Sequence, residues 1–209
     1  MIGVLGGTFD PIHFGHLRTA LDVMQAVDLD EVRFIPLHSA VHRDQPETAA
    51  ELRLQMVTAA IAGQAGFVAD DRELCRQGDS YTVDTLVSLH RDFPDHTLCL
   101  LLGMDAFNGF ATWRQPEKIL SLAHLIVMQR PGEKVASDVW IQSLLTTHQC
   151  NDAEKMKHEA AGRILIQEVT QLDVSSTKIR SLIAAGHSPR YLLPEGVRQI
   201  IDKNSLYLR

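Results

Sequence analysis

The sequence predicts an α/β protein whose doubly wound, mostly parallel sheet carries helices on both faces. Short apolar segments alternate with longer segments in which apolar residues recur at helical spacing. The apolar segments are continuous rather than alternating, which is typical of strands buried on both faces. With 209 residues, we expect a single domain over 1–209, in which a core of 1–174 precedes a small C-terminal helical segment of 175–209.

The predicted elements follow one another in β-α order. Strands are expected, as short runs rich in Ile, Val, Leu and Phe, over 2–5, 32–37, 67–69, 97–102, 125–128 and 164–166. Helices are expected, from apolar residues three or four positions apart, over 15–26, 48–63, the residues after Thr82, 175–185 and 194–202. Two glycines after the first strand predict a tight turn. The segment 131–163 has the weakest pattern, so we expect it to leave the sheet as an excursion.

Composition excludes several classes of protein. A hydrophobic content of 45% and a charged content of 22% are typical of a globular chain. A net charge of −6 argues against a general nucleic-acid binder, although 175–209 has six Lys or Arg against two Asp or Glu. The three cysteines form no CxxC pair, and neither a leader nor a membrane span is evident. We therefore expect a cytoplasmic protein with no membrane or nucleic-acid partner, and a homo-oligomer remains open.

The first candidate site is the segment 6–16, which reads Gly-Gly-Thr-Phe-Asp-Pro-Ile-His-Phe-Gly-His. Gly6 and Gly7 directly follow a strand, where a backbone without side chains can approach a phosphate. His13 and His16 lie at the start of a predicted helix, and imidazole N–H groups can donate to phosphate oxygens. A zinc site is a weaker interpretation, because no third ligand has suitable spacing.

The second candidate site is the predicted helix start at 175–180, which reads Ser-Ser-Thr-Lys-Ile-Arg. Hydroxyl groups and unsatisfied backbone N–H groups at a helix start, followed by two cations, favour an anion. An ordinary helix cap with solvated basic residues is the alternative interpretation.

Together the two segments resemble the HxGH and SSTxxR signatures of the nucleotidyltransferase superfamily. Within it, the sequence is similar to the bacterial nicotinate-nucleotide adenylyltransferases over almost the whole chain, and the segment 80–85 and Trp113 favour this branch. The resemblance implies a Rossmann-like fold. It also implies an enzyme that joins ATP and nicotinate mononucleotide, releases pyrophosphate and forms deamido-NAD.

The resemblance also implies roles for individual residues. The catalytic residues would be His13, His16, Lys178 and Arg180. ATP would be bound by Gly6, Gly7, Thr8, Phe9, His16, Gly103, Asp105, Ser175, Ser176, Thr177 and Arg180. Nicotinate mononucleotide would be bound by His42, Arg43, Thr82, Trp113, Arg114 and Arg130. Mg²⁺ would arrive with ATP, and no metal site of the protein itself is expected.

Several alternatives remain at the level of sequence. The acceptor could be nicotinamide mononucleotide or phosphopantetheine, or the chain could be a non-catalytic nucleotide sensor. A tRNA-binding fragment is disfavoured by the acidic balance. Asp105 could be a helix cap and Trp113 a core residue. The loop after the second strand lacks the proline pair usual in the family, reading Ser-Ala-Val-His-Arg over 39–43, which lifts a restriction on its backbone.

Overall fold

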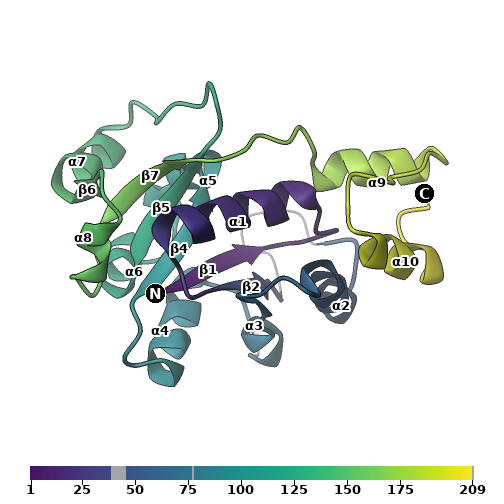
Figure 1. Ribbon diagram of the computed structural model, residues 1–209, viewed down its shortest axis with the longest axis horizontal. Coiled ribbons are helices and arrows are strands. Elements are labelled where there is room, and N and C mark those ends of the chain that lie inside the picture. The colour runs from purple at the N-terminus through teal and green to yellow at the C-terminus, as the bar shows by residue number, and fades with distance from the viewer. Residues whose placement is uncertain (39–45, 77, 209) are drawn as a thin grey trace. The chain divides into compact units, whose positions relative to one another are not determined.

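The computed structural model describes residues 1–38, 46–76 and 78–208. Among these residues the strands form one seven-stranded sheet in the order β3-β2-β1-β4-β5-β7-β6 (Figure 1). The pairs β1–β4, β4–β5, β5–β7 and β6–β7 are parallel. The predicted Rossmann-like α/β architecture with a parallel sheet is thus confirmed.

The elements have the following bounds. The strands are β1 Ile2–Gly7, β2 Glu31–Pro36, β3 Phe67–Ala69, β4 Leu98–Gly103, β5 His124–Gln129, β6 Gln149–Cys150 and β7 Ile164–Glu168. The helices are α1 Phe14–Val27, α2 Ala50–Ile61, α3 Arg72–Cys75, α4 Thr82–Asp92, α5 Met104–Asn108, α6 Pro116–Leu122, α7 Val139–His148, α8 Glu154–Lys157, α9 Ser176–Ala184 and α10 Glu195–Lys203, with a 3₁₀ turn at Phe110–Thr112.

The central strands explain why the apolar runs are continuous. In β4 the five residues before Gly103 are all buried. Leu100 lies opposite Val4 of β1 on one side and opposite Leu125 of β5 on the other. A strand with neighbours on both edges and helices over its faces has no position where a polar side chain would reach water.

The chain divides into two compact units. The first unit comprises Met1–Leu5, Thr19–Val32 and Tyr81–Gln171. The second unit comprises Gly6–Arg18, Arg33–Ser80 and Leu172–Arg209. The expectation of a single domain over 1–209 stays a prediction.

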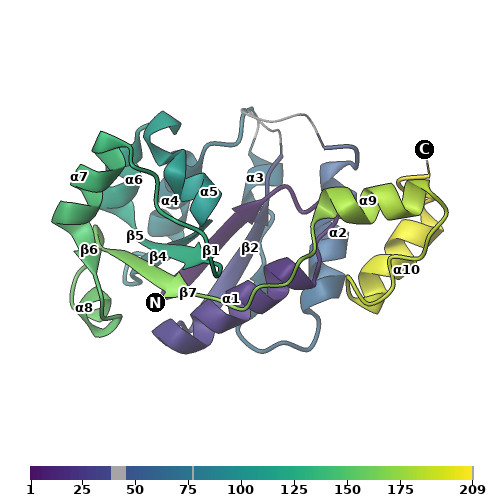
Figure 2. The same ribbon diagram turned by 90° about the horizontal axis from the view of Figure 1, so that it is seen from above.

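Within the second unit, α10 packs on α2, and the two helices lie side by side in both views (Figures 1 and 2). Val197 and Ile201 are the buried residues of α10. A Cβ atom added at Gly196 would lie 3.2 Å from the Cβ of Ala59 in α2, so the glycine permits a close approach of the two helices.

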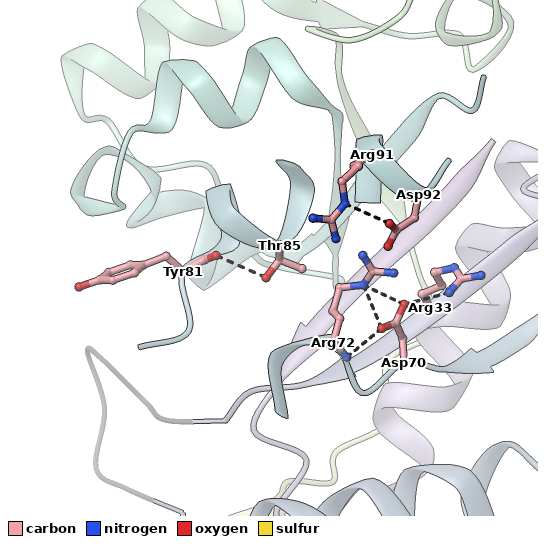
Figure 3. A network of polar contacts seen from close by, with 7 residues as sticks. All are labelled: Arg33, Asp70, Arg72, Tyr81, Thr85, Arg91 and Asp92. Atoms are coloured by element: carbon pink, nitrogen blue, oxygen red, sulfur yellow. Dashed lines mark hydrogen bonds and ion pairs between the residues drawn. The ribbon is translucent and has the colours of Figure 1, made fainter. Parts of the chain in front are cut away.

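A charged cluster follows β3 in the same unit (Figure 3). Asp70 is 7% exposed and accepts hydrogen bonds from the guanidinium groups of Arg33 and Arg72, each at 2.9 Å. Two arginines around one buried carboxylate satisfy its oxygen atoms and join the end of β3 to β2.

The segment 131–163 differs from the expected excursion, because it contains α7, β6 and α8. The strand β6 pairs with β7 through Gln149 opposite Ile164 and Cys150 opposite Leu165. The expectation was wrong because a two-residue strand is too short to show a period in the sequence. Among the described residues, no helix is long and apolar enough to cross a membrane.

Candidate active site

The two histidines of the first motif form a reciprocal cap at the start of α1. The helix begins at Phe14, so His13 is its cap residue. The Gly15 N–H donates to His13 Nδ1 at 3.1 Å, and the His13 N–H donates to His16 Nδ1 at 3.3 Å. The arrangement is related to a capping box, with two differences: both side chains are imidazoles, and the His13 ring accepts from the second helical residue, Gly15, while the His16 N–H donates to the His13 carbonyl.

These hydrogen bonds also decide which ring nitrogen carries the proton. A nitrogen that accepts a hydrogen bond has no proton, so the neutral rings of His13 and His16 are protonated on Nε2. The rings stack with centroids 3.8 Å apart and an interplanar angle of 28°. Both imidazoles can therefore offer an Nε2–H donor at a helix N-terminus, where anions are favoured.

The three glycines of the motif have different reasons to be glycine. A Cβ added at Gly15 would lie 2.9 Å from the His13 ring, and one at Gly7 would lie 3.0 Å from the Phe9 ring. A Cβ added at Gly6 would meet no atom of the described residues within 4 Å. The packing of the protein thus requires Gly7 and Gly15, whereas Gly6 borders open space that a ligand could approach.

The predicted tight Gly-Gly turn is wrong. Gly6 and Gly7 are the last two residues of β1, and neither has a positive φ. The left-handed residue is Phe9, with φ of 49°. Its ring is buried and meets the His16 ring edge-on, with centroids 5.2 Å apart. The chain turns at an aromatic residue because the burial of that ring offsets the strained backbone.

A buried arginine holds the loop that follows β1. Arg53 of α2 is 1% exposed. Its guanidinium donates to the carbonyl oxygens of Thr8 at 2.8 Å, Leu37 at 2.8 Å and Thr48 at 3.0 Å. Burial lowers the pKa of Arg53, and the nearby Asp10 carboxylate opposes that shift. One side chain thus fixes the backbone after β1, after β2 and before α2.

The carboxylate of Asp10 is enclosed by donors. It is 3% exposed. Its Oδ1 accepts from the Tyr207 hydroxyl, and its Oδ2 accepts from the Glu47 N–H at 2.8 Å and the Thr48 N–H at 3.4 Å. Burial and the hydrogen bond to Asp10 raise the pKa of Tyr207, so its phenol stays protonated. The peptide bond between Asp10 and Pro11 is cis.

The second motif is bound to the first within the second unit. Ser175 caps α9 by accepting from the Lys178 N–H at 3.2 Å. Ser176 Oγ donates to the Pro11 carbonyl at 2.9 Å, and Arg180 donates to the Asp10 carbonyl at 2.8 Å. The structure therefore brings the two predicted phosphate motifs together through the loop between Phe9 and His13.

The cations of the second motif differ in their surroundings. Arg180 is half-buried and also pairs with Glu47 at 3.0 Å. Lys178 is exposed and lies 3.6 Å from Asp173. Ser175 and Thr177 are exposed at the helix start. Arg180 thus stabilises the contact between the two motifs and is also a candidate ligand for phosphate. Lys178 forms one weak ion pair at the surface.

The candidate adenosine residues lie in the first unit, where β4 passes into α5. Gly103 is the cap residue of α5, and Asp105 is an exposed residue of its first turn. Asp105 is therefore not the helix cap, which removes one alternative for this residue. A Cβ added at Gly103 would meet no described atom within 4 Å, as at Gly6.

The candidate acceptor residues of the same unit converge on the segment after the 3₁₀ turn. Trp113 is half-buried, and its ring meets Phe110 edge-on at 5.5 Å. Arg114 stacks over the Tyr81 ring at 4.5 Å and pairs with Asp84 at 3.6 Å. These contacts bring Trp113 and Arg114 to the start of α4, where Thr82 is the first residue.

The surroundings of Trp113 make it more than a core residue. Phe110 is 0% exposed and also contacts the Trp140 ring, with centroids 6.1 Å apart. Trp113 packs on this cluster by one edge and keeps part of its surface exposed.

At the start of α4, the Thr85 hydroxyl donates to the Tyr81 carbonyl at 3.4 Å, as Figure 3 shows.

The remaining acceptor candidates are Arg130, His42 and Arg43. Arg130 is exposed, and its backbone forms a turn with Glu133, since the Arg130 N–H donates to the Glu133 carboxylate at 2.9 Å. His42 and Arg43 lie outside the described residues. Among the residues that are described, no group of three or more His, Cys, Asp or Glu could hold a metal ion.

Comparisons with known proteins show the family of this chain. A family model described as cytidylyltransferase-like matches residues 4–182. A relative from Aeromonas hydrophila, named a probable nicotinate-nucleotide adenylyltransferase, is 43% identical over 99% of this chain and 96% of its own. A relative of the same name from Methylococcus capsulatus is 41% identical, with both chains covered fully. The chain belongs to the nicotinate-nucleotide adenylyltransferase family.

A solved structure supports the fold of this adenylyltransferase family member. The nicotinic acid mononucleotide adenylyltransferase of Plasmodium falciparum, solved as a complex with NaAD, has a TM-score of 0.72 at 18% identity. The match covers 99% of this chain and 96% of that chain. The likeness of fold thus extends over residues of both units.

Three residues of this adenylyltransferase contact the motifs without having been predicted to do so. Arg53 donates to the Thr8 carbonyl, and Tyr207 donates to the Asp10 carboxylate. Thr48 donates its N–H to Asp10 and its hydroxyl to Tyr207. Arg53 had a visible signal, because it is a charged residue three and four positions before Met56 and Val57 on the apolar face of a predicted helix. Tyr207 had none, since Asp10 lies 197 positions away.

Proposed function

We propose that this adenylyltransferase transfers the AMP part of ATP to nicotinate mononucleotide, which gives deamido-NAD and pyrophosphate in the synthesis of NAD. The reaction type is supported by the imidazole pair at the start of α1, which is the observation that carries the proposal. The acceptor is supported by full-length relatives that bear this name.

The chemistry requires alignment more than proton transfer. A phosphate oxygen of nicotinate mononucleotide attacks the α-phosphorus of ATP, a new P–O bond forms, and the bond to the β-phosphate breaks to release pyrophosphate. The nucleophile is already anionic at neutral pH, because the second pKa of a phosphate monoester is about 6. The site must therefore hold the two phosphates in line and stabilise the charge that develops on the phosphate oxygens.

The phosphate side of the site matches this requirement. His13 and His16 would donate through Nε2–H to oxygens of the reacting phosphates, which favours the transition state over the ground state. Gly6, Gly7, Thr8 and Phe9 would supply backbone contacts, and the hydroxyls of Ser175, Ser176 and Thr177 would line the start of α9. Lys178 and Arg180 would neutralise the pyrophosphate as it leaves. Mg²⁺ enters as part of the substrate, bound to ATP through phosphate oxygens and water.

The candidate nucleoside-binding residues form a separate group. Gly103 and Asp105 would bind adenosine, with the Asp105 carboxylate accepting from ribose hydroxyls. Trp113 would stack on the nicotinate ring, since an electron-poor pyridinium over an indole is a favourable pair. The other proposed acceptor contacts are Thr82, Arg114, Arg130, His42 and Arg43. We place the reaction in the cytoplasm, which agrees with the free thiols of Cys75, Cys99 and Cys150.

The deciding experiment measures pyrophosphate release from ATP with three acceptors: nicotinate mononucleotide, nicotinamide mononucleotide and phosphopantetheine. We expect nicotinate mononucleotide to give the highest kcat/KM, by roughly 100-fold or more over the amide, because donors placed for a carboxylate lose their partner with an amide. Turnover with phosphopantetheine alone would overturn the acceptor assignment. Binding of ATP without turnover of any acceptor would favour a nucleotide sensor.

The stacking role of Trp113 has a separate test. Trp113→Ala should raise the KM for nicotinate mononucleotide about 10-fold, the scale of one cation–π contact, and leave the KM for ATP unchanged. Val139→Ala is a matched control, because Val139 is 84% exposed on α7 of the same unit. An increase in the KM for ATP alone would contradict the stacking role.

A further inference from the structure

We propose that Tyr207 is a positioning residue for the reaction, acting through Asp10 on the loop that carries His13 and His16. The inference rests on the proposed function, because it concerns the loop to which that function assigns the phosphate contacts. Tyr207 itself would touch no substrate.

The hydrogen bonds around Tyr207 have one direction. Thr48 Oγ1 donates to the Tyr207 oxygen at 2.9 Å, so the tyrosine proton is left to donate to Asp10 Oδ1. The other carboxylate oxygen of Asp10 already accepts two backbone N–H groups. Tyr207 is 8% exposed, Thr48 4% and Asp10 3%, so water does not readily replace a lost partner.

The backbone on both sides of this contact is strained. Phe9, directly before Asp10, has φ of 49°, and Tyr207 has φ of 64°. Such left-handed conformations are unfavourable at residues other than glycine and persist only where their surroundings fix them. The hydrogen bond between Tyr207 and Asp10, the residue after Phe9, can fix the backbone at both Phe9 and Tyr207.

A displacement of Asp10 would reach both histidines. On one side, Phe9 meets the His16 ring at 5.2 Å. On the other side, His13 follows Asp10 by three positions, and its own N–H bonds to His16 Nδ1. An error of about 1 Å in the placement of a catalytic group can cost about 100-fold in rate. Loss of the Tyr207 hydroxyl should therefore affect the chemical step more than substrate binding.

The first test is Tyr207→Phe, which removes only the hydroxyl. We expect kcat to fall about 10- to 100-fold, with the KM values for both substrates within about 2-fold of wild type. The assay uses whichever acceptor the wild-type enzyme turns over, so a wrong acceptor assignment would not be mistaken for a failure of this inference. Val197→Ala is the matched control, because it opens a cavity in α10 at a residue that is 0% exposed. It should lower Tm and leave kcat unchanged.

The second test is a double-mutant cycle with Asp10→Asn. If Tyr207 acts through Asp10, the combined variant should have a kcat close to that of the slower single variant. If the two losses in kcat multiply, Tyr207 acts elsewhere and the inference is overturned. Wild-type kcat in Tyr207→Phe, or an equal loss of kcat in Val197→Ala, would also overturn it.

A third measurement does not depend on turnover. In ¹⁵N-histidine NMR spectra, the ring signals of His13 and His16 should shift in Tyr207→Phe and stay in place in Val197→Ala. Unshifted signals in Tyr207→Phe would contradict the proposed link. Should Tyr207→Phe not fold, Thr48→Val removes the hydroxyl that orients the phenol, and the same losses in kcat and the same shifts are expected.

Discussion

His13 and His16 have one task that the structure shows and a second task that we propose for them. A serine or aspartate commonly caps a helix, and an arginine or lysine commonly binds phosphate. Each of these imidazoles uses Nδ1 as an acceptor at the start of α1, and the proposed function assigns its Nε2–H to phosphate. Under that proposal the fold would maintain the ring orientation before substrate arrives, which would lower the reorganisation required in the reaction.

Replacement of His16 should show the catalytic task most clearly. His16→Ala is expected to lower kcat by roughly 10²- to 10³-fold, the scale of losing one donor in the transition state. Steady-state pyrophosphate release at saturating ATP and acceptor measures this loss. A kcat close to wild type would mean that His16 serves only as a helix cap.

Alanine at Gly6 and alanine at Gly15 should differ in their effect on stability. Gly6→Ala leaves the fold undisturbed, because its Cβ meets no described atom within 4 Å, so Tm should stay within a few degrees of wild type. If phosphate approaches this backbone, kcat/KM for ATP should fall at least about 10-fold. Gly15→Ala should lower both Tm and kcat, since its Cβ would press on the His13 ring. Unchanged kcat/KM in Gly6→Ala would remove Gly6 from the ATP site.

The sequence predicted the residues of both motifs because each lies at a helix start and within one short segment. It did not predict Arg53 or Tyr207 as parts of the same site. The partners of Arg53 are backbone carbonyls, which every residue has, so they leave no pattern in the sequence. Asp10 is 197 positions from Tyr207, too far for a local pattern. Local pattern finds groups that touch a ligand more readily than groups that hold the backbone.

At the scale of elements, β5 begins at a histidine that is 0% exposed, His124. Its Nδ1 accepts from the Arg163 N–H at 3.0 Å, and its Nε2 donates to the carbonyls of Met156 and Glu159 at 3.1 and 2.9 Å. This neutral ring ties β5 to the segment around α8. Burial lowers the pKa of His124 below its ordinary value of 6.5, although the two carbonyls oppose that shift.

The sign of the resulting pH dependence follows directly. The unfolded chain takes up a proton at His124 near pH 6.5, whereas the folded chain does so only at lower pH. The stabilisation is thus complete above pH 6.5 and is lost as pH falls toward the folded pKa, with a slope of up to about 1.4 kcal/mol per pH unit. We expect the free energy of unfolding, measured in urea between pH 5 and 8, to depend less steeply on pH in His124→Gln than in the wild type. Identical slopes in both proteins would contradict this account.

The strands were predicted more completely than the helices. The predicted strand at 67–69 matches β3, and most other predicted strands are within about two residues of those observed. The helices α3, α5, α6, α7 and α8 and the two-residue β6 were not predicted, although α7 has ten residues. A four-residue helix makes barely one turn, so it shows no apolar period.

At the scale of the whole molecule, neither compact unit is a continuous piece of chain. Three of their boundaries fall inside β1, α1 and β2, as at Leu5 and Gly6. Each of these elements therefore belongs to both units. Separate domains commonly meet at exposed linkers rather than inside a strand or a helix, so this division favours the prediction of one domain.

Unfolding should accordingly be a single transition. Trp113 and Trp140 both lie in the first unit, so tryptophan fluorescence reports on that unit. Hydrogen exchange of the amides in α2 and α10 reports on the second unit. The two probes should give the same urea midpoint if 1–209 is one domain. Distinct midpoints would show two domains.

The histidine cap at α1 also defines a pattern of tolerance to mutation. Position 14 contributes its N–H to the Leu192 carbonyl, and its side chain is 38% exposed, so many residues should be accepted there. The rings at positions 13 and 16 stack on each other, and a side chain at position 15 would press on the ring of His13. Few other residues should therefore be accepted at these three positions. In a saturation library of residues 13–16 selected for activity, position 14 should therefore accept many amino acids, and positions 13, 15 and 16 should accept few.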